Sequence, residues 1–390
     1  MFQVCKIRTG CCTRRSNMAT ANTERAIDIA LVLFLFSPLV ICYWSSTWTI
    51  LDLYLFPSNQ ITSGWVSVCV SISIMGMTFL VQSRLNGYIR PEQPVRYVIV
   101  TRIYTYVTAF AFVNNWRGLW MLMDTYSGVT LTGACWNLFG GVTGLVLLRA
   151  YRNVLAPPGA WSLDVNTETH FTVLTLFRSK RGGIFNVIDV VFCVTVVSTF
   201  VLLVWRGKWL LLQLSLALVL SNNLWQAVIT TAAAHVLQLV LYITQFPARK
   251  LSAYLHTERP ILQVVFDNVW VFITCYSSVM YWQGMWTLAR LLLEGSPPDL
   301  TQWLIHIIAF GGLMVLRLST TLQFPGYFID GEFPQGLVLT PPYVSTFLMT
   351  PSYSLKNSTE TFHGMSVTTI STEIPSPDNA TGDILESTHM

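Results

Sequence analysis

The chain has 390 residues, of which 53% are hydrophobic and only 11% are charged, and its net charge is +4. A soluble globular protein carries about 25% charged residues, so this composition excludes an ordinary soluble domain. The apolar runs do not alternate over about ten residues as barrel strands do, so the sequence predicts an all-α fold, a polytopic membrane helical bundle.

Residues 1–25 form a leader that is rich in basic residues, among them Arg14, Arg15 and Arg25. Cytosolic segments next to membrane spans collect lysine and arginine, so we expect this leader to be cytosolic. The leader also contains cysteines that are candidates for S-acylation, with reduced thiols as the open alternative. They are Cys5, Cys11 and Cys12.

We predict eight membrane spans, because each apolar run approaches the roughly 20 residues that a helix needs to cross a bilayer. The expected spans are residues 27–50, 64–83, 98–123, 131–150, 187–209, 217–243, 267–292 and 303–322. The boundary between the fifth and sixth spans is the least defined, since the chain from Leu210 to Leu220 stays apolar. Asn222 and Asn223 mark an alternative turn.

Basic residues divide the connecting loops into two classes. The loops after the second, fourth and sixth expected spans carry clusters of arginine and lysine, whereas residues 57–63, 124–130 and 293–302 carry none. This asymmetry predicts that both termini are cytosolic. Arg206 and Lys208 are exceptions, because they fall on the outer side.

Four segments share a pattern of two tryptophans four residues apart, with a small residue midway. They are Trp44-Ser45-Ser46-Thr47-Trp48, Trp116-Arg117-Gly118-Leu119-Trp120, Trp205-Arg206-Gly207-Lys208-Trp209 and Trp282-Gln283-Gly284-Met285-Trp286. Residues at i and i+4 lie on one face of a helix. Because indoles favour the headgroup level, we predict a ring of eight tryptophans at the outer interface. Anchoring there is the expected role, and a ligand site is the alternative.

The tryptophan motifs also reveal an internal repeat. Trp44 and Trp48 match Trp205 and Trp209 at an offset of 161 residues, and the third-span motif maps to that of the seventh span at an offset of 166. An even number of spans per half restores the orientation, so we predict two parallel four-helix repeats. The expected organisation is a leader 1–25, repeat 26–155, cytosolic linker 156–186, repeat 187–323 and tail 324–390.

Charged residues near the motifs allow two readings. The sharper hypothesis is a cationic outer vestibule for an anionic ligand, formed by Arg117, Arg206, Lys208 and Arg290. The reading that we favour is bracing by ion pairs with the outer acidic residues Asp52, Asp124 and Glu294. His235, in the sixth expected span, is read as a neutral helix-packing residue, with a proton relay as the alternative.

Catalytic motifs are missing from the sequence. It has no nucleophile elbow, phosphate-binding glycine loop or zinc-protease helix, and its eight cysteines form no Cys-x-x-Cys pair. We therefore expect a protein that is not an enzyme, that holds no cofactor or metal, and that binds no nucleic acid.

The last part of the chain changes character. Residues 351–390 are rich in serine and threonine and poor in apolar residues, so we expect the cytosolic tail to be largely disordered. The chain ends with a hydroxyl residue two positions before an apolar C-terminus, as ligands of PDZ domains do. Thr388 and Met390 are therefore candidate partner-binding residues.

Several motifs occur in an order that resembles the Fuseless family over roughly residues 24–325. These are the Trp-Arg-Gly-x-Trp copies, the Ile-Asp starts of spans one and five, and the Phe-Gly-Gly segments of spans four and eight. The chain departs from the pattern at Ser45, Ser46 and Gln283. The resemblance implies an eight-pass presynaptic plasma-membrane protein that supports the placement or function of voltage-gated calcium channels, and so neurotransmitter release.

Two functions therefore compete. The resemblance implies a non-enzymatic organiser whose partners are membrane lipids and a voltage-gated calcium channel or presynaptic scaffold. The alternative is a transporter or lipid-handling protein, for which parallel repeats are a familiar architecture. The sequence puts most charges at the interfaces and leaves His235 as the main midplane candidate, which favours the organiser.

Overall fold

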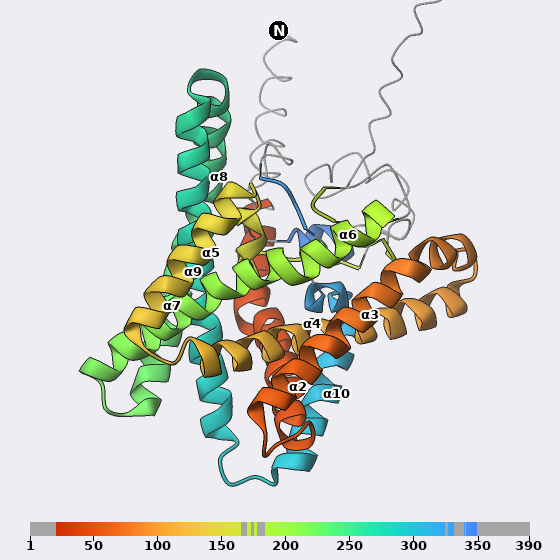
Figure 1. Cartoon of the computed structure of the whole chain (residues 1–390). Helices are drawn as coiled ribbons and strands as arrows, with labels where there is room; N and C mark the ends of the chain where they lie inside the picture. Colours follow the sequence, from red (N-terminus) through yellow and green to blue (C-terminus); the bar gives the residue numbers. More distant parts are fainter. Residues whose placement is uncertain are drawn as a thin grey trace, which may run out of the picture. The chain divides into compact units, whose positions relative to one another are not determined.

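The computed structural model describes residues 21–164, 170–172, 175–177, 184–323, 327–330, 339 and 341–348 (Figure 1). The chain divides into two units, Met1–Met349 and Thr350–Met390, and every described residue belongs to the first. The described residues form helices and connections without a β-strand, which confirms the all-helical expectation for this part of the chain. The candidate residues Cys5, Cys11, Cys12, Thr388 and Met390 lie outside it.

The described part contains eight long helical stretches. The first covers Ala21–Tyr54 and includes a π-helical turn, η1 (Val32–Phe36), before α2 (Ser37–Tyr54). The fifth covers Ile184–Val219 and comprises α6 (Ile184–Phe192), the π-helical turn η3 (Cys193–Val197) and α7 (Ser198–Val219). The others are α3 (Gln60–Tyr88), α4 (Pro94–Tyr126), α5 (Leu131–Leu147), α8 (Asn223–Glu258), α9 (Pro260–Leu292) and α10 (Pro298–Val315).

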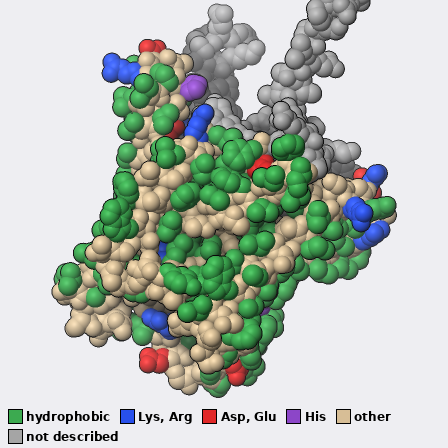
Figure 2. All heavy atoms as spheres, in the orientation of Figure 1, with side chains coloured by type: hydrophobic (Ala, Val, Ile, Leu, Met, Phe, Trp, Pro, Cys, Tyr) green, Lys and Arg blue, Asp and Glu red, His purple; other side chains and the backbone are tan. Residues whose placement is uncertain are grey.

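The helices have the length and surface of membrane-spanning segments. Five of them are long and apolar enough to cross a bilayer, namely Ala21–Tyr54, α3, Ile184–Val219, α8 and α9. Large apolar side chains are exposed on these helices, including Phe34, Leu80 and Val236. Figure 2 shows hydrophobic side chains over much of one face, with few charged side chains between them. Such a surface is suited to lipid and not to water, so the chain is a membrane protein.

The turn between α7 and α8 corrects one expected boundary. α7 continues to Val219, and the Asn222 side chain accepts hydrogen bonds from the backbone N–H groups of Leu224 and Trp225 at the start of α8. Asparagine is a favoured N-cap because its side chain satisfies N–H groups that have no partner within the helix. The boundary expected between residues 209 and 217 is therefore wrong, and the alternative turn at Asn222 and Asn223 is confirmed.

Each helix that carries a tryptophan motif packs along one helix that lacks it. The pairs are α4 with α3, α7 with α5, α9 with α8 and α2 with α10 (Figure 1). Two residues turn a helix by about 200°, so the central residue of the motif faces away from both tryptophans. The motif therefore presents indoles on one side and a small residue to the paired helix on the other.

The central glycine allows the paired helix to approach closely. A Cβ atom built on Gly118, Gly207 or Gly284 would lie 2.6, 2.7 or 2.8 Å from a backbone atom of α3, α5 or α8, respectively. These distances are too short for a side chain, so the paired backbones would have to move apart. In α2 the corresponding residue is Ser46, whose hydroxyl donates to a carbonyl of its own helix.

The segments that follow α5 and α10 exchange hydrogen bonds. The short helix η2 (Tyr151–Val154) follows α5, and η4 (Ser319–Leu322) follows α10. The carboxylate of Asp330 accepts from the first two N–H groups of η2, both at 2.8 Å. The carboxylate of Asp164 accepts from the first two N–H groups of η4, at 3.2 and 2.8 Å. Each segment therefore caps the short helix of the other.

The backbone repeats this exchange. Arg149 and Arg317 lie two residues after the last residues of α5 and α10, and each has a positive φ, of 52° and 55°. The N–H of Asp330 donates to the carbonyl of Arg149 at 2.6 Å, and the N–H of Asp164 donates to that of Arg317 at 2.9 Å. Both arginines follow a leucine in the sequence. This recurring Leu-Arg, followed later by an aspartate, is a repeat signal that the expected boundaries left out.

The second half of the chain extends past residue 323, where the sequence predicted the tail to begin. Tyr327, Leu339 and Val344 are buried in the main hydrophobic core. The N–H of Val344 also donates to the Asp28 carboxylate at 2.8 Å. The boundary at 323 is therefore too early, because the apolar residues spaced between the prolines of this segment pack against the helices.

Candidate functional site

The tryptophan pairs of α2, α4, α7 and α9 point toward one another and form two rings. In the first ring, each indole contacts two others edge to face, with centroids 5.4–5.7 Å apart and planes at 77–84°. Its members, in order around the ring, are Trp44, Trp116, Trp205 and Trp282.

The second ring is built in the same way, one helical turn further along. Its centroids lie 5.7–6.4 Å apart, with planes at 84–89°. Its members, in the same order, are Trp48, Trp120, Trp209 and Trp286. Edge-to-face indole pairs contribute about 0.5–1.5 kcal/mol each beyond their buried area, so the closed rings hold the four helices together.

The rings change the expected role of the tryptophans. The sequence predicted anchoring at the headgroup level, but each indole is engaged by two other indoles within the bundle. Trp205 and Trp282 are buried, and the other six are partly buried. Helix–helix packing is therefore the contact that these side chains make, while their depth in the bilayer stays a prediction.

A buried connection contacts the first ring. The indole N–H of Trp205 donates to the carbonyl of Val154 at 2.8 Å, and that of Trp282 donates to the carbonyl of Pro157 at 2.6 Å. The Tyr242 hydroxyl donates to the next carbonyl, that of Pro158, at 2.8 Å. Because a buried indole N–H needs an acceptor, this segment satisfies polar groups that the rings leave unpaired.

Arg117 forms an internal clamp beside the rings. Its side chain is 1% exposed, and its Nε donates to the Asp52 carboxylate at 2.7 Å. Its terminal nitrogens donate to the hydroxyls of Ser67 and Ser63 on α3, at 2.9 and 2.8 Å. The guanidinium therefore ties the end of α2 to α3 and α4.

Arg206 forms a second clamp of the same design. It is fully buried, and its Nε and one terminal nitrogen donate to the Asp124 carboxylate at 3.0 and 2.8 Å. It also donates to the Ser127 hydroxyl and the Gly128 carbonyl. In both clamps the aspartate follows the second tryptophan of a motif by four residues, so each clamp joins two neighbours in the ring.

The four cations proposed for a vestibule do not surround one opening. Arg117 and Arg206 are buried with carboxylates, and Lys208 is buried with its Nζ 2.9 Å from the Phe272 carbonyl and over the Phe272 ring. Arg290 is exposed and makes no ion pair with a described residue. This is the arrangement expected for bracing, with Asp52 and Asp124 as the acidic partners.

His235 packs between helices. Its ring lies 5.3 Å from that of Phe34 and 4.9 Å from that of Tyr281, between centroids, and its Nδ1 is 2.8 Å from the Thr231 carbonyl oxygen. A carbonyl only accepts, so Nδ1 carries a proton. These contacts fit the helix-packing reading of this residue.

His306 is a polar contact that sequence reasoning missed. It is buried, with Nδ1 2.9 Å from the Thr47 hydroxyl and Nε2 3.0 Å from the Tyr106 hydroxyl. These bonds connect α10 to α2 and α4. A histidine near the end of an apolar run has no spacing pattern that would reveal partners 200 and 259 residues away.

Within the described ranges, no group of three or more histidine, cysteine, aspartate or glutamate residues is placed to hold a metal ion.

The family model described as Fuseless matches residues 23–322. No curated protein and no solved structure matches the chain.

Proposed function

Because the chain belongs to the Fuseless family, we propose that it is a presynaptic plasma-membrane protein with eight spans in two parallel repeats and with both termini in the cytosol. Two observations support the repeats. The π-helical turns η1 and η3 start at residues 32 and 193, which is the offset of 161 that relates the tryptophan motifs. A rotation by 180° that places α2 on α7 and α4 on α9 also places each of the four helix pairs on another pair. The same rotation places the aspartate cap of η2 on that of η4.

The function that we propose is non-enzymatic support of the placement or function of voltage-gated calcium channels, and thereby of neurotransmitter release. Family membership is the reason to consider this role. The observation that favours it is the closed double ring of indoles, braced by Arg117 and Arg206 through internal ion pairs. Such a core suits a rigid platform whose outer surfaces meet other proteins.

A transporter or lipid-handling protein ranks second. Parallel repeats are known in transporters, where polar groups near the midplane bind the solute. Here the His235 ring stacks on Phe34 and packs at a tilt against Tyr281, and its Nδ1 is bonded to its own helix. A residue engaged in this way fits helix packing better than proton relay.

Co-purification from neuronal membranes tests the organiser role. The full chain should retain a pore-forming calcium-channel subunit, and a Trp120→Leu/Trp209→Leu variant should retain less of it. Trp136→Leu is the matched control, because Trp136 is 68% exposed and lies outside both rings. Removing the last three residues should reduce capture of a PDZ-domain scaffold and leave the folded protein unchanged.

A flux measurement distinguishes the alternative. Proteoliposomes that contain the full chain should show no saturable solute uptake if the protein is an organiser. Saturable uptake that is lost in His235→Ala, combined with no retention of a channel subunit, would reverse the ranking of the two functions.

A further inference from the structure

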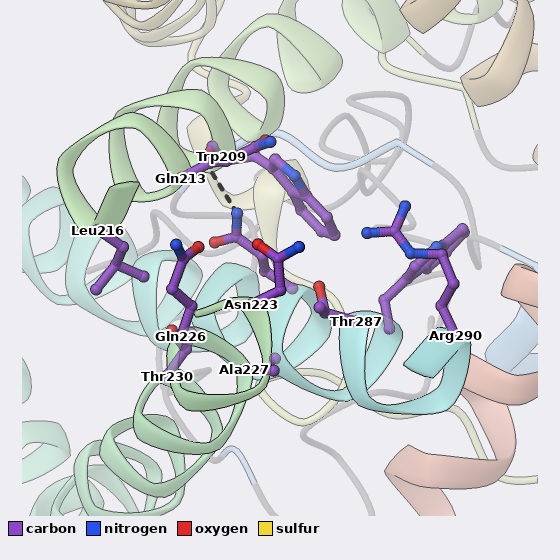
Figure 3. A pocket seen from close by; sticks show the side chains of 12 residues that line it. Trp209, Gln213, Leu216, Asn223, Gln226, Ala227, Thr230, Thr287 and Arg290 are labelled. Atoms are coloured by element: carbon purple, nitrogen blue, oxygen red, sulfur yellow. Dashed lines mark hydrogen bonds between the residues drawn. The ribbon is translucent and has the colours of Figure 1, made fainter. Parts of the chain in front are cut away.

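A cavity of about 180 Å³ lies between α7, α8 and α9, beside the second tryptophan ring (Figure 3). This is more than ten times the roughly 10–15 Å³ that one water needs. The indoles of Trp209 and Trp286 form its apolar part, and the polar residues that matter most are Gln213, Gln226, Gln283 and Arg290. Figure 3 shows Arg290 approaching the cavity from the side opposite Gln226.

The cavity arises where a clamp is missing. Gln283 follows the first tryptophan of its motif, the position held by Arg117 and Arg206 in two other motifs. Gln213 follows the second tryptophan of its motif by four residues, the position held by the partner aspartates. Both glutamines are uncharged, and Gln283 is shorter than an arginine, so the two form no ion pair and the space between the helices stays open.

Two groups at this cavity lack partners. Gln283 is 8% exposed, and its Oε1 has no hydrogen-bond partner among the described residues, while its Nε2 donates to the Trp209 carbonyl at 3.4 Å. Arg290 is exposed and makes no ion pair with them. A buried acceptor without a donor is costly, so Gln283 Oε1 calls for a donor from outside the chain.

Among the described residues that line the cavity none is acidic, so Arg290 has no carboxylate partner there. We infer that this cavity binds a small zwitterion whose oxyanion pairs with Arg290 and whose primary ammonium donates to Gln283 Oε1. Guanidinium groups bind carboxylates and phosphates through paired hydrogen bonds. A cation is also stabilised against indole faces, which Trp209 and Trp286 provide.

The same chemistry occurs in two sources, the phosphoethanolamine headgroup of a lipid and a free zwitterion of similar size. Phosphocholine carries the same phosphate but a quaternary ammonium without N–H donors, so it should bind less well. Ethanolamine lacks the oxyanion and should lose the contact with Arg290. Phosphocholine therefore tests the contact with Gln283, and ethanolamine tests the contact with Arg290.

The test uses the full chain, purified in detergent, and titration calorimetry with phosphoethanolamine, phosphocholine and ethanolamine. We expect saturable binding of phosphoethanolamine that weakens about tenfold or more in Arg290→Gln, which corresponds to the loss of one charge-assisted contact. Gln283→Leu should weaken it as well. Arg84→Gln is the matched control, since Arg84 is an exposed arginine on α3 far from the cavity in sequence and should leave binding unchanged.

A second experiment distinguishes a lipid headgroup from a free zwitterion as the source of the ligand. The protein is placed in phosphatidylcholine nanodiscs with a minor share of phosphatidylethanolamine, and retained lipids are counted by native mass spectrometry. Retention of phosphatidylethanolamine that is lost in Arg290→Gln, without binding of the free compound, identifies a lipid headgroup as the ligand. Binding that is unchanged in Arg290→Gln, or no binding in either arm, overturns the inference. Neither result bears on calcium-channel retention, so the proposed organiser role is tested separately.

Discussion

Arg117 and Asp52 form an ion pair whose partners differ in exposure, so we expect the loss of one partner to change stability differently from the loss of the other. The arginine is 1% exposed, whereas the aspartate side chain is 47% exposed. A buried charge that loses its partner is strongly destabilising, while a half-exposed carboxylate can be hydrated instead. Asp52 therefore matters more for stability than its exposure indicates, because it compensates the buried charge of Arg117.

We expect Asp52→Ala to destabilise the protein by about 1–3 kcal/mol, between the values for exposed and buried pairs. Adding Arg117→Met should recover part of this loss, because the double variant no longer buries an unpaired charge. Thermal unfolding in detergent, followed by size-exclusion chromatography, measures both. A double variant that is less stable than Asp52→Ala would contradict the clamp.

Asp164 lies in a connection outside the spans and carries a pH-dependent contribution. Burial opposes its charge, but Arg102 and the hydrogen bonds from Thr320 and Ser319 hold the pKa of Asp164 below its usual value. A carboxylate whose pKa is depressed on folding adds stability above its unfolded pKa of about 4, and loses it as pH falls through the folded value.

The unfolding temperature of the wild-type protein should therefore fall as the pH decreases from about 5 to about 3. Asp164→Asn should be less stable than wild type at pH 7 and should lack this part of the acid-induced fall. Glu92→Gln serves as the control, because Glu92 is exposed in the turn between α3 and α4. An acid profile that is the same in Asp164→Asn and wild type would exclude this contribution.

At the residue scale, the sequence predicted the clamps but not the cavity. The sequence put Arg117 and Arg206 on the same side as three outer acidic residues, and the structure pairs them with two of these three. It gave no means of seeing that Gln283 and Gln213 would leave space, because a cavity depends on side-chain volumes across three helices. The partner of Lys208 could not be predicted from the sequence either, since it is a backbone carbonyl.

At the scale of helices, the close pairs depend on the glycine at the centre of the motif. We expect Gly207→Ala to destabilise the protein by about 1–3 kcal/mol, because a Cβ would meet the α5 backbone at 2.7 Å and force α5 from α7. The measurement is again thermal unfolding in detergent.

Gly140→Ala provides the matched control on α5. A Cβ on Gly140 meets no described residue within 4 Å, so alanine should be neutral or slightly stabilising there through its higher helix propensity. If Gly207→Ala and Gly140→Ala had the same stability, the close approach would not explain the motif glycine.

The existence of the helices was predictable, whereas some ends were not. Apolar runs located each helix, but the stretch after Trp209 is apolar on both sides of the expected turn, and only the cap at Asn222 decides where α8 begins. The pairing of α5 with α7, and of α10 with α2, brings together segments that periodicity alone cannot connect.

At the scale of the molecule, the parallel repeats make a topological prediction. Turns 56–59 and 220–222 lie at corresponding ends of the two halves, as do the turn 90–93 and the connection at Arg259. N-glycosylation tags in the first two turns should both be modified, and tags in the last two should not, because parallel repeats keep each span in the same direction.

The tags distinguish the possible arrangements when the tagged proteins are expressed in cells and their mobility is compared with and without glycosidase. Modification at 56–59 together with the connection at Arg259, but not at 220–222, would mean that the second half is inverted. The structure supplies the choice of sites, since the residues of all four turns are mostly exposed.

The exchanged aspartate caps also bear on how the protein is made. During translation the first half emerges with the opening N–H groups of η2 unpaired, and their acceptor, Asp330, lies 179 residues beyond Tyr151. The first half can insert and pack its helices earlier, but this cap is completed only when Asp330 has left the ribosome. A premature stop codon before Asp330 would therefore leave a defect in the half that was synthesised in full.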